Sequence, residues 1–250
     1  MNYVITPNPQ AAVPVAGSDS YFPVRRIFCV GRNYGEHAKE MGFSDKEPPF
    51  FFTKPADAIV ENGATIPYPP ITNDLHHEIE MVLAIGKEGA NISADAAMDH
   101  VWGAGVGIDL TRRDQQIAHR EKGRPWCWGK AFDNSAPMTS FHPLSALPQA
   151  QQGLDSGRIW LSVNGEMRQD ADLNDMIWNV RDIIAFCSQS VTLKAGDLIM
   201  TGTPAGVGAV TSGDVLEGGV EGIGEIKITS YPTNGESIYL TLKMIQMERN

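Results

Sequence analysis

The stretch NDLHHEIEMVLAIG, residues 73–86, places Glu78 and Glu80 one residue apart, just before an apolar run. Side chains alternate between the two faces of a β-strand. The pattern therefore predicts one face of Glu78, Glu80, Val82 and Ala84 and an opposite face of Ile79, Met81, Leu83 and Ile85. The apolar face requires a core, whereas the neighbouring carboxylates repel each other unless solvent or a cation neutralises them. This stretch is either a solvated strand face or part of a metal site.

The composition is that of a folded domain with an acidic surface. The chain has 250 residues, of which 42% are hydrophobic and 20% charged, enough for one substantial core. Its formal net charge is -10 and it has no run of Lys or Arg, which argues against nucleic acid or an anionic membrane as a partner. An anionic small molecule would have to be held by local cations or by a metal.

Cysteine usage and the N-terminus predict a cytoplasmic protein. Cys29, Cys127 and Cys187 are odd in number and widely spaced, which is typical of a reducing compartment. The N-terminus lacks the charged and apolar segments of a leader, and no run approaches the roughly 18 apolar residues of a membrane span. Residues 1–24, rich in Pro, Ala, Gly and Ser, are predicted to be an arm, followed by a single domain over residues 25–250.

Strand signals outnumber helix signals along the chain. Short β-branched and aromatic runs predict strands at 25–31, 50–53, 79–85, 104–109, 159–163 and 197–200, and Asn164-Gly165 is a hairpin signal. The stretch 34–43 is predicted to be a short helix or helical loop that ends at Gly42. Further helices are predicted at 93–103, 111–123 with Thr111 as N-cap, and 173–189. Because no regular βαβ alternation is present, the fold class is β-rich α+β.

Asp109 is a candidate third ligand beside the two glutamates. In GAGVGIDLTRRD, residues 103–114, Asp109 ends a small-residue strand and precedes a helix. Three carboxylates without a Cys or His ligand favour a hard divalent ion, Mg²⁺ or Mn²⁺. His76 and His77 have no further soft ligand at a useful spacing, so they are expected to pack or to orient the strand rather than to bind zinc.

Two other segments carry chemistry-bearing residues. If GRNYGEHAKEMG, residues 31–42, is helical over 35–41, His37 and Glu40 share a face, where the carboxylate can orient the imidazole as a general base. The alternative is an ordinary surface pair. TGTPAGVG, residues 201–208, lacks the ending of a phosphate loop and is interpreted as a turn that approaches a ligand closely.

The order of these motifs resembles that of the fumarylacetoacetate hydrolase family, in particular its short acylpyruvase members. The resemblance covers about residues 25–230 and depends on VGRNYGEHAKEM, FFTKP, HHEIE, GIDLTRRDQQ, GRPWCWGKAFD, LKAGDLIMTGTPAGVG and GDVLEGGVEGIG. It implies a mixed β-sandwich roll, a homodimer, and a catalytic domain in residues 25–250. The separate N-terminal domain of the longer family members is expected to be absent.

The resemblance also implies roles for individual residues. Mg²⁺ or Mn²⁺ would be bound by Glu78, Glu80 and Asp109. His37 and Glu40 would activate water on a segment that closes over the substrate, and Lys130 would lie near the reacting oxygen. Substrate-facing positions would be Lys54, Arg113, Gln116 and Thr203. Independently of the resemblance, Arg32, Arg112 and Arg113 are all candidates to hold a distal carboxylate.

The implied activity is hydrolysis of the C–C bond of acylpyruvates, which are 2,4-dioxo acids. Fumarylpyruvate, an intermediate of aromatic-compound degradation, would give fumarate and pyruvate. The same site could instead decarboxylate oxaloacetate, a 2-keto acid, because both reactions form the pyruvate enolate. An isomerase or hydratase of the same fold is a further alternative. A non-catalytic metal-binding β-domain would explain the carboxylates but not Lys130 or the His37/Glu40 pair.

Overall fold

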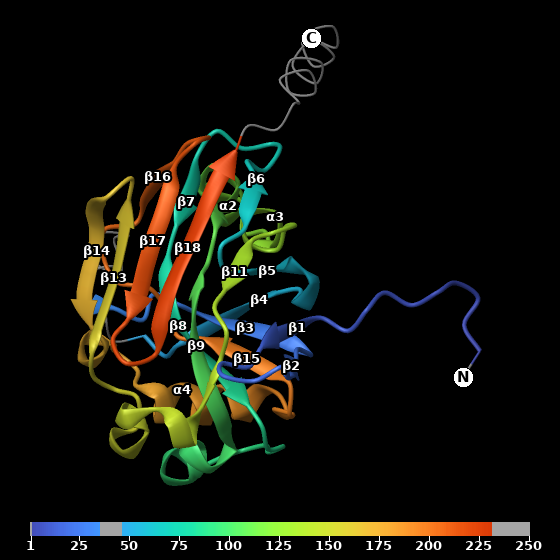
Figure 1. Ribbon diagram of the computed structural model, residues 1–250, viewed down its shortest axis with the longest axis vertical. Helices are drawn as coiled ribbons and strands as arrows, with labels where there is room; N and C mark the ends of the chain where they lie inside the picture. Colours follow the sequence, from blue (N-terminus) through green and yellow to red (C-terminus); the bar gives the residue numbers. More distant parts are fainter. Residues whose placement is uncertain (1, 36–46, 232–250) are drawn as a thin grey trace, which may run out of the picture.

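The structure, a computed structural model, describes residues 2–35 and 47–231 (Figure 1). Within these ranges the strands form four sheets, of two, three, five and eight strands. The eight-stranded sheet runs, from edge to edge, through β4 (Phe50–Lys54), β3 (Arg26–Gly31), β15 (Asp197–Met200), β8 (Ile79–Ile85), β9 (Val101–Ile108), β11 (Ala136–Met138) and β5 (Ile59–Glu61), while β12 (His142–Pro143) pairs with β9. Parallel and antiparallel pairs both occur in it.

Three smaller sheets complete the described strands. The five-stranded sheet is β14 (Glu166–Asp172), β13 (Arg158–Val163), β17 (Val215–Val220), β18 (Gly224–Tyr231) and β6 (Thr65–Pro67), and its long strands stand side by side in Figure 1. The three-stranded sheet is β10 (Thr111–Arg112), β7 (Leu75–His77) and β16 (Gly208–Val210), and the hairpin is β1 (Ala12–Pro14) with β2 (Tyr21–Pro23).

Helices are short and few in the described part of the chain. The α-helices are α2 (Arg113–Glu121), α3 (Cys127–Lys130) and α4 (Val180–Ser190). The 3₁₀ turns are η1 (Ala56–Ala58), η2 (Ala94–His100), η3 (Leu144–Ala146), η4 (Pro148–Gln152) and η5 (Leu173–Asp175). The predicted β-rich α+β sandwich roll is confirmed. None of the helices described is long and apolar enough to cross a membrane.

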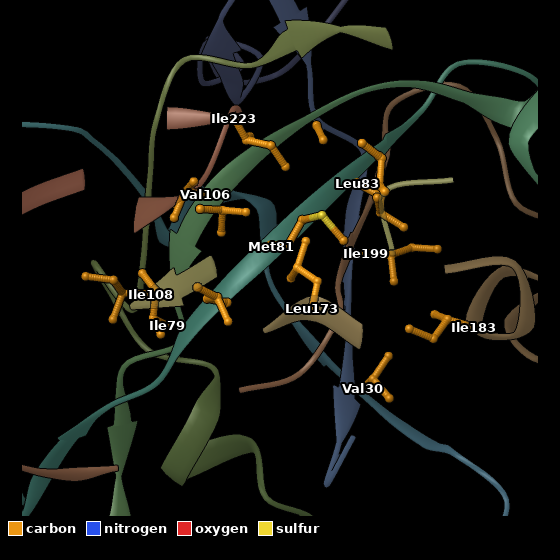
Figure 2. Packing of buried hydrophobic residues seen from close by; sticks show 14 of the residues in the cluster. Val30, Ile79, Met81, Leu83, Val106, Ile108, Leu173, Ile183, Ile199 and Ile223 are labelled. Atoms are coloured by element: carbon orange, nitrogen blue, oxygen red, sulfur yellow. The ribbon is translucent and has the colours of Figure 1, made fainter. Parts of the chain in front are cut away.

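Strand β8 separates two hydrophobic cores. Its Ile79, Met81, Leu83 and Ile85 belong to the larger cluster, together with side chains of the five-stranded sheet and of α4. Figure 2 shows Met81 among Val106, Leu173 and Ile199 of this cluster. Val82 and Ala84, on the opposite face, belong to a second cluster that Val13 and Phe22 of the N-terminal hairpin also enter. The predicted alternation is confirmed, and the glutamate face leads into a core rather than into solvent.

Strand and turn predictions hold better than the helix boundaries. Residues 79–85 and 197–200 are strands with the predicted bounds. Asn164 and Gly165 join β13 to β14 with positive φ of 52° and 79°, as the hairpin signal predicts.

The predicted helix over 93–103 is wrong. It is the 3₁₀ turn η2, and Val101 already starts β9, where it pairs with Ile85. The pairing of Val101 in strand β9 outweighs the Ser and Gly signals that predicted a helix across this segment.

The predicted helices 111–123 and 173–189 differ from the structure at their starts. Thr111 does not cap α2, because it belongs to β10 and pairs with His76. The predicted helix 173–189 is divided, since Asp172 caps η5 and Asn179 caps a separate helix α4. Two side chains that accept hydrogen bonds from backbone N–H groups compete for the helix start, and each begins its own turn. The predicted helix at 34–43 lies mostly outside the described residues.

Candidate active site

The antiparallel pairing of β8 with β9 brings the three predicted carboxylates together. Ile79 pairs with Ile108, so Glu78, just before β8, lies beside Asp109, just after β9. The backbone N–H of Asp109 donates to the carbonyl of Glu78 at 2.8 Å. Carboxylate oxygens of Glu78, Glu80 and Asp109 lie within 4.8 Å of one another, and all three residues are buried. We refer to these three residues as the triad.

Lys130 bridges two members of the triad. It is the last residue of α3, and its Nζ donates to Glu78 Oε2 and to Asp109 Oδ2, each at 2.7 Å. The same Nζ donates to Thr111 Oγ1 at 2.6 Å. Gly129 allows this approach, because a Cβ there would lie 2.8 Å from the backbone nitrogen of Gln116 in α2. These three acceptors therefore hold the Lys130 ammonium in a fixed position.

Two further buried cations pair with the triad. Arg113, the first residue of α2, pairs with Glu78 through one guanidinium nitrogen and donates to Gln116 Oε1 through another. Lys54 Nζ lies 2.9 Å from Asp109 Oδ1. The ion pairs of the site thus go to Glu78 and Asp109, while Glu80 Oε2 accepts a hydrogen bond from a backbone N–H at 2.7 Å.

The pKa values of Glu80 and Lys130 are both raised, for different reasons. Burial raises the pKa of Glu80 well above its ordinary value, and the charges of Asp109 and Glu78 raise it further. Burial alone would lower the pKa of Lys130, but Asp109 and Glu78 outweigh it and the pKa is raised. Lys130 is therefore protonated, and Glu80 is the carboxylate with most to gain from an added cation.

A cavity of about 30 Å³ lies beside the triad. Its walls are Val30, Gly31, Arg32, Phe52, Glu78, Glu80, Arg113, Gln116, Trp126, Lys130 and Thr203. This space admits water or an ion next to the carboxylates. Of the residues predicted to bind substrate, Arg32, Arg113, Gln116 and Thr203 all reach this cavity.

Other predicted residues lie elsewhere. Lys54 is fully buried behind Asp109 and is not part of the cavity wall. His37 and Glu40 lie outside the described residues. His76 contacts Asp74 at 2.9 Å, and His77 Nδ1 contacts Gln169 Oε1 at 3.0 Å.

The predicted ligand-approaching turn at 201–208 contacts the triad and contributes Thr203 to the cavity wall. Gly202 has a φ of 97°, and its N–H donates to Glu80 Oε2 at 2.7 Å. A Cβ on Gly202 would lie 2.6 Å from Cβ of Asn33, so only glycine fits. Asn33 Nδ2 donates to the carbonyl of Thr201 at 2.8 Å. Sequence analysis missed Asn33, whose only signal is its place between the predicted Arg32 and the helix at 34–43.

The donors of the triad fit a hard divalent cation. They are three carboxylates held close together, and Glu80 is buried with a raised pKa that a bound cation would lower. The adjoining cavity leaves room for oxygen ligands from water or from a second molecule. Such a site keeps open coordination positions for chemistry.

A β-roll with three buried carboxylates suited to a divalent cation indicates a metal-dependent enzyme. Comparison with known proteins identifies its family. The family model for the fumarylacetoacetate (FAA) hydrolase C-terminal region matches residues 26–229. A fumarylpyruvate hydrolase of a Ralstonia species is 46% identical over 186 residues, which are 74% of this chain and 94% of that protein. The mitochondrial oxaloacetate tautomerase of Rattus norvegicus is 40% identical over 199 residues, 80% of this chain and 88% of that protein.

A solved structure agrees with both sequence comparisons. The crystal structure of fumarylpyruvate hydrolase from Pseudomonas aeruginosa in complex with Mn²⁺ and pyruvate is 46% identical, with a TM-score of 0.88. The match covers 93% of this chain and 100% of that one. The chain belongs to the fumarylacetoacetate hydrolase family, as the order of its motifs predicts, and it is an enzyme of that family.

The charge of Glu80 should strengthen metal binding but lower the stability of the metal-free fold. We expect Glu80→Gln to weaken Mn²⁺ binding by about tenfold or more, because one formal charge leaves the ligand set. The metal-free variant should be at least as stable as wild type above the raised pKa of Glu80. A carboxyl with a raised folded-state pKa destabilises the fold as pH rises through that pKa, and the neutral amide removes this cost.

Titration calorimetry with Mn²⁺ and chemical denaturation of the metal-free protein measure the two quantities. Glu88→Gln is the matched control, because the Glu88 side chain is 61% exposed. Unchanged Mn²⁺ affinity in Glu80→Gln would remove Glu80 from the ligand set.

Proposed function

We propose that this enzyme hydrolyses the C–C bond of acylpyruvates, and in particular cleaves fumarylpyruvate to fumarate and pyruvate in the breakdown of aromatic compounds. The observation that carries the proposal is the Lys130 ammonium, buried and bonded to two carboxylates of the triad beside a cavity with cationic and polar walls. Such a site is suited to negative charge that develops on an oxygen. The similarity to two fumarylpyruvate hydrolases supports the choice of substrate.

We propose that Glu78, Glu80 and Asp109 hold Mg²⁺ or Mn²⁺. When bound, the cation would offset the charge of the triad and polarise the carboxylate and 2-keto oxygens of the substrate. Arg113 and Gln116, fixed to each other by a hydrogen bond, present donors at the same cavity. They would orient the substrate, and Arg32 would face its distal carboxylate.

We propose that His37, oriented by Glu40, removes a proton from the attacking water. The hydroxide adds to the carbonyl carbon at position 4, and the bond between carbons 3 and 4 breaks with its electron pair moving to the pyruvyl unit. Lys130 stabilises the resulting enolate oxygen. The proton held by His37 then returns to carbon 3, so that one water molecule is consumed and pyruvate and a carboxylic acid are formed.

Oxaloacetate is the second candidate substrate, because the tautomerase of Rattus norvegicus is 40% identical to this chain. Oxaloacetate has the same 2-keto acid unit, and its decarboxylation gives the same enolate without attack by water. Tautomerisation requires only proton transfer next to that unit. The cavity residues would bind either substrate, so activity measurements must rank them.

Fumarylpyruvate should show a higher kcat/KM for hydrolysis than oxaloacetate shows for decarboxylation or tautomerisation. Steady-state kinetics with fumarylpyruvate, maleylpyruvate, acetylpyruvate and oxaloacetate, with Mg²⁺ and with Mn²⁺, measure this ranking. Chelation should abolish turnover, and either metal should restore it. A tenfold preference for oxaloacetate, about 1.4 kcal/mol in transition-state free energy, would reverse the ranking.

We further propose a homodimer in the cytoplasm. The family resemblance supports the dimer. The cysteines support the compartment: Cys29, Cys127 and Cys187 are all free thiols, and Cys29 and Cys187 are buried.

A further inference from the structure

Gln169 is a buried amide in an otherwise exposed strand. It lies in β14, whose neighbours Met167, Arg168 and Asp170 are exposed, yet its own exposure is 0%. The pairing of β13 with β14 shifts register between Leu161 and Ser162, next to Gln169. Gln169 pairs with the buried Leu161 and shares a strand face with the partly buried Ala171, so its side chain points inward, where it reaches Thr203.

The amide uses all four of its hydrogen-bonding positions. Oε1 accepts from the backbone N–H of Ile79 at 3.2 Å and contacts His77 Nδ1 at 3.0 Å. Nε2 donates to Thr203 Oγ1 at 2.8 Å and to the carbonyl of Pro204 at 2.9 Å. The backbone groups decide the orientation of the amide, because an N–H can only donate and a carbonyl can only accept.

This orientation fixes the polarity of the Thr203 hydroxyl. Because Nε2 donates to Oγ1, the hydroxyl oxygen is used as an acceptor and its own proton remains for another group. Thr203 is buried and lines the cavity beside Glu78, Glu80 and Lys130. The acceptor best placed for that proton is an anionic oxygen of a molecule held in this cavity.

We propose that Gln169 is a positioning residue that makes Thr203 a hydrogen-bond donor to the carboxylate of a bound 2-keto acid. The same amide joins the turn at 203–204 to Ile79, the residue between the ligand carboxylates Glu78 and Glu80. It therefore sets the donor at a fixed position relative to the triad. This inference depends on the proposed function for the identity of the anion.

Gln169→Glu gives the sharpest test, because it keeps size and shape but reverses one end of the side chain. The new carboxylate cannot donate, so Thr203 would turn its proton inward to the glutamate and away from the cavity. Pyruvate, titrated into Mn²⁺-loaded protein, should then bind about 10- to 100-fold more weakly, whereas Mn²⁺ itself should bind with nearly wild-type affinity. Hydrolysis of fumarylpyruvate should show a raised KM with a smaller change in kcat.

A double-mutant cycle separates positioning from general support of the fold. Thr203→Val removes the hydroxyl at nearly constant volume and should weaken pyruvate binding to a similar degree, while Thr203→Ser should retain affinity. If Gln169 acts through Thr203, Gln169→Glu should add little to Thr203→Val. Glu166→Gln, on an exposed position of the same strand, is the matched control and should bind pyruvate as wild type does.

The outcomes are distinct. Equal pyruvate affinity in wild type and Gln169→Glu, or additive losses in the cycle, would overturn the inference. Wild-type pyruvate affinity in Thr203→Val would also overturn it, even if the Gln169 variant fails to fold. Wild-type protein that binds Mn²⁺ and pyruvate but leaves fumarylpyruvate uncleaved contradicts the proposed function alone, because the binding cycle can still be read.

Discussion

Lys130→Met is expected to destabilise the metal-free protein by about 3–5 kcal/mol, the usual effect of removing one partner of a buried ion pair. The ammonium bridges Glu78 and Asp109 at 2.7 Å each, and all three groups are buried. Without it, the triad keeps its carboxylates but loses the cation that contacts two of them. The same substitution should lower kcat for hydrolysis by roughly 10²–10³, the range found when one donor to a developing oxyanion is removed.

Metal affinity should change in the opposite direction from activity. Lys130 and a bound cation both carry positive charge beside the same carboxylates, so methionine at this position should strengthen Mn²⁺ binding. Saturating Mn²⁺ should therefore recover more stability in the variant than in wild type. Denaturation with and without Mn²⁺, together with a metal titration and steady-state kinetics, measures all three effects.

Lys227→Met is the matched control for stability. Lys227 Nζ also lies 2.7 Å from a carboxylate, that of Glu217, but the two side chains are 61% and 42% exposed. A pair in solvent should contribute less than about 1 kcal/mol. Equal losses in the two variants would show that burial of the Lys130 pairs has no special weight. Full activity in Lys130→Met would exclude its role at the reacting oxygen.

His37→Ala should lower hydrolytic kcat by roughly 10² to 10⁴, the range for loss of a general base, and leave Mn²⁺ affinity nearly unchanged. Among the described residues, the triad cavity has no histidine in its wall. His76, next to the triad in sequence, contacts Asp74 and accepts a hydrogen bond from Arg113, and His77 contacts Gln169. The proposal therefore assigns the base to His37 rather than to these two histidines.

Glu40→Gln should have a smaller effect than His37→Ala. The amide can still hydrogen-bond to the imidazole but no longer stabilises its protonated form. Any decarboxylation of oxaloacetate should suffer less than hydrolysis in both variants, because it needs no activated water. Kinetics on both substrates beside a Mn²⁺ titration provide the measurement, with His100→Ala, at an exposed hydrogen bond, as control. Unchanged hydrolysis in His37→Ala would place the base elsewhere, and lost metal binding would place His37 among the ligands.

Local sequence patterns predicted the strand of the triad but not every helix start. The alternation over 79–85 was sufficient, because a strand with both faces buried must keep its register. Thr111 has the residue type of an N-cap, yet its hydroxyl accepts from Lys130 Nζ, and its backbone pairs with β7. These are tertiary contacts with residues far along the chain, which no local pattern contains.

The residues that hold the triad in place were not predictable from their own surroundings. Gln169 is within EMRQDAD, a run that reads as an exposed polar strand, and its side chain faces inward because it pairs with the buried Leu161 of β13. Asn33 is buried because two separate segments meet around it: the carbonyl of Thr201 and the backbone of Trp178. The candidate ligand and substrate-binding residues could be predicted from motifs in the sequence. The amides that support them could not, because their positions depend on how distant segments pack.

Strand β8 pairs with β15 on one edge and with β9 on the other, and its two faces contact two different cores. Its backbone amides should therefore exchange with solvent deuterium only through global unfolding, at the slowest rates in the molecule. The triad adjoins a cavity, so a metal ion can leave without any opening of the strand. A chelator should accordingly strip the metal from a fully folded protein, with deuterium uptake over residues 79–85 still limited by complete unfolding.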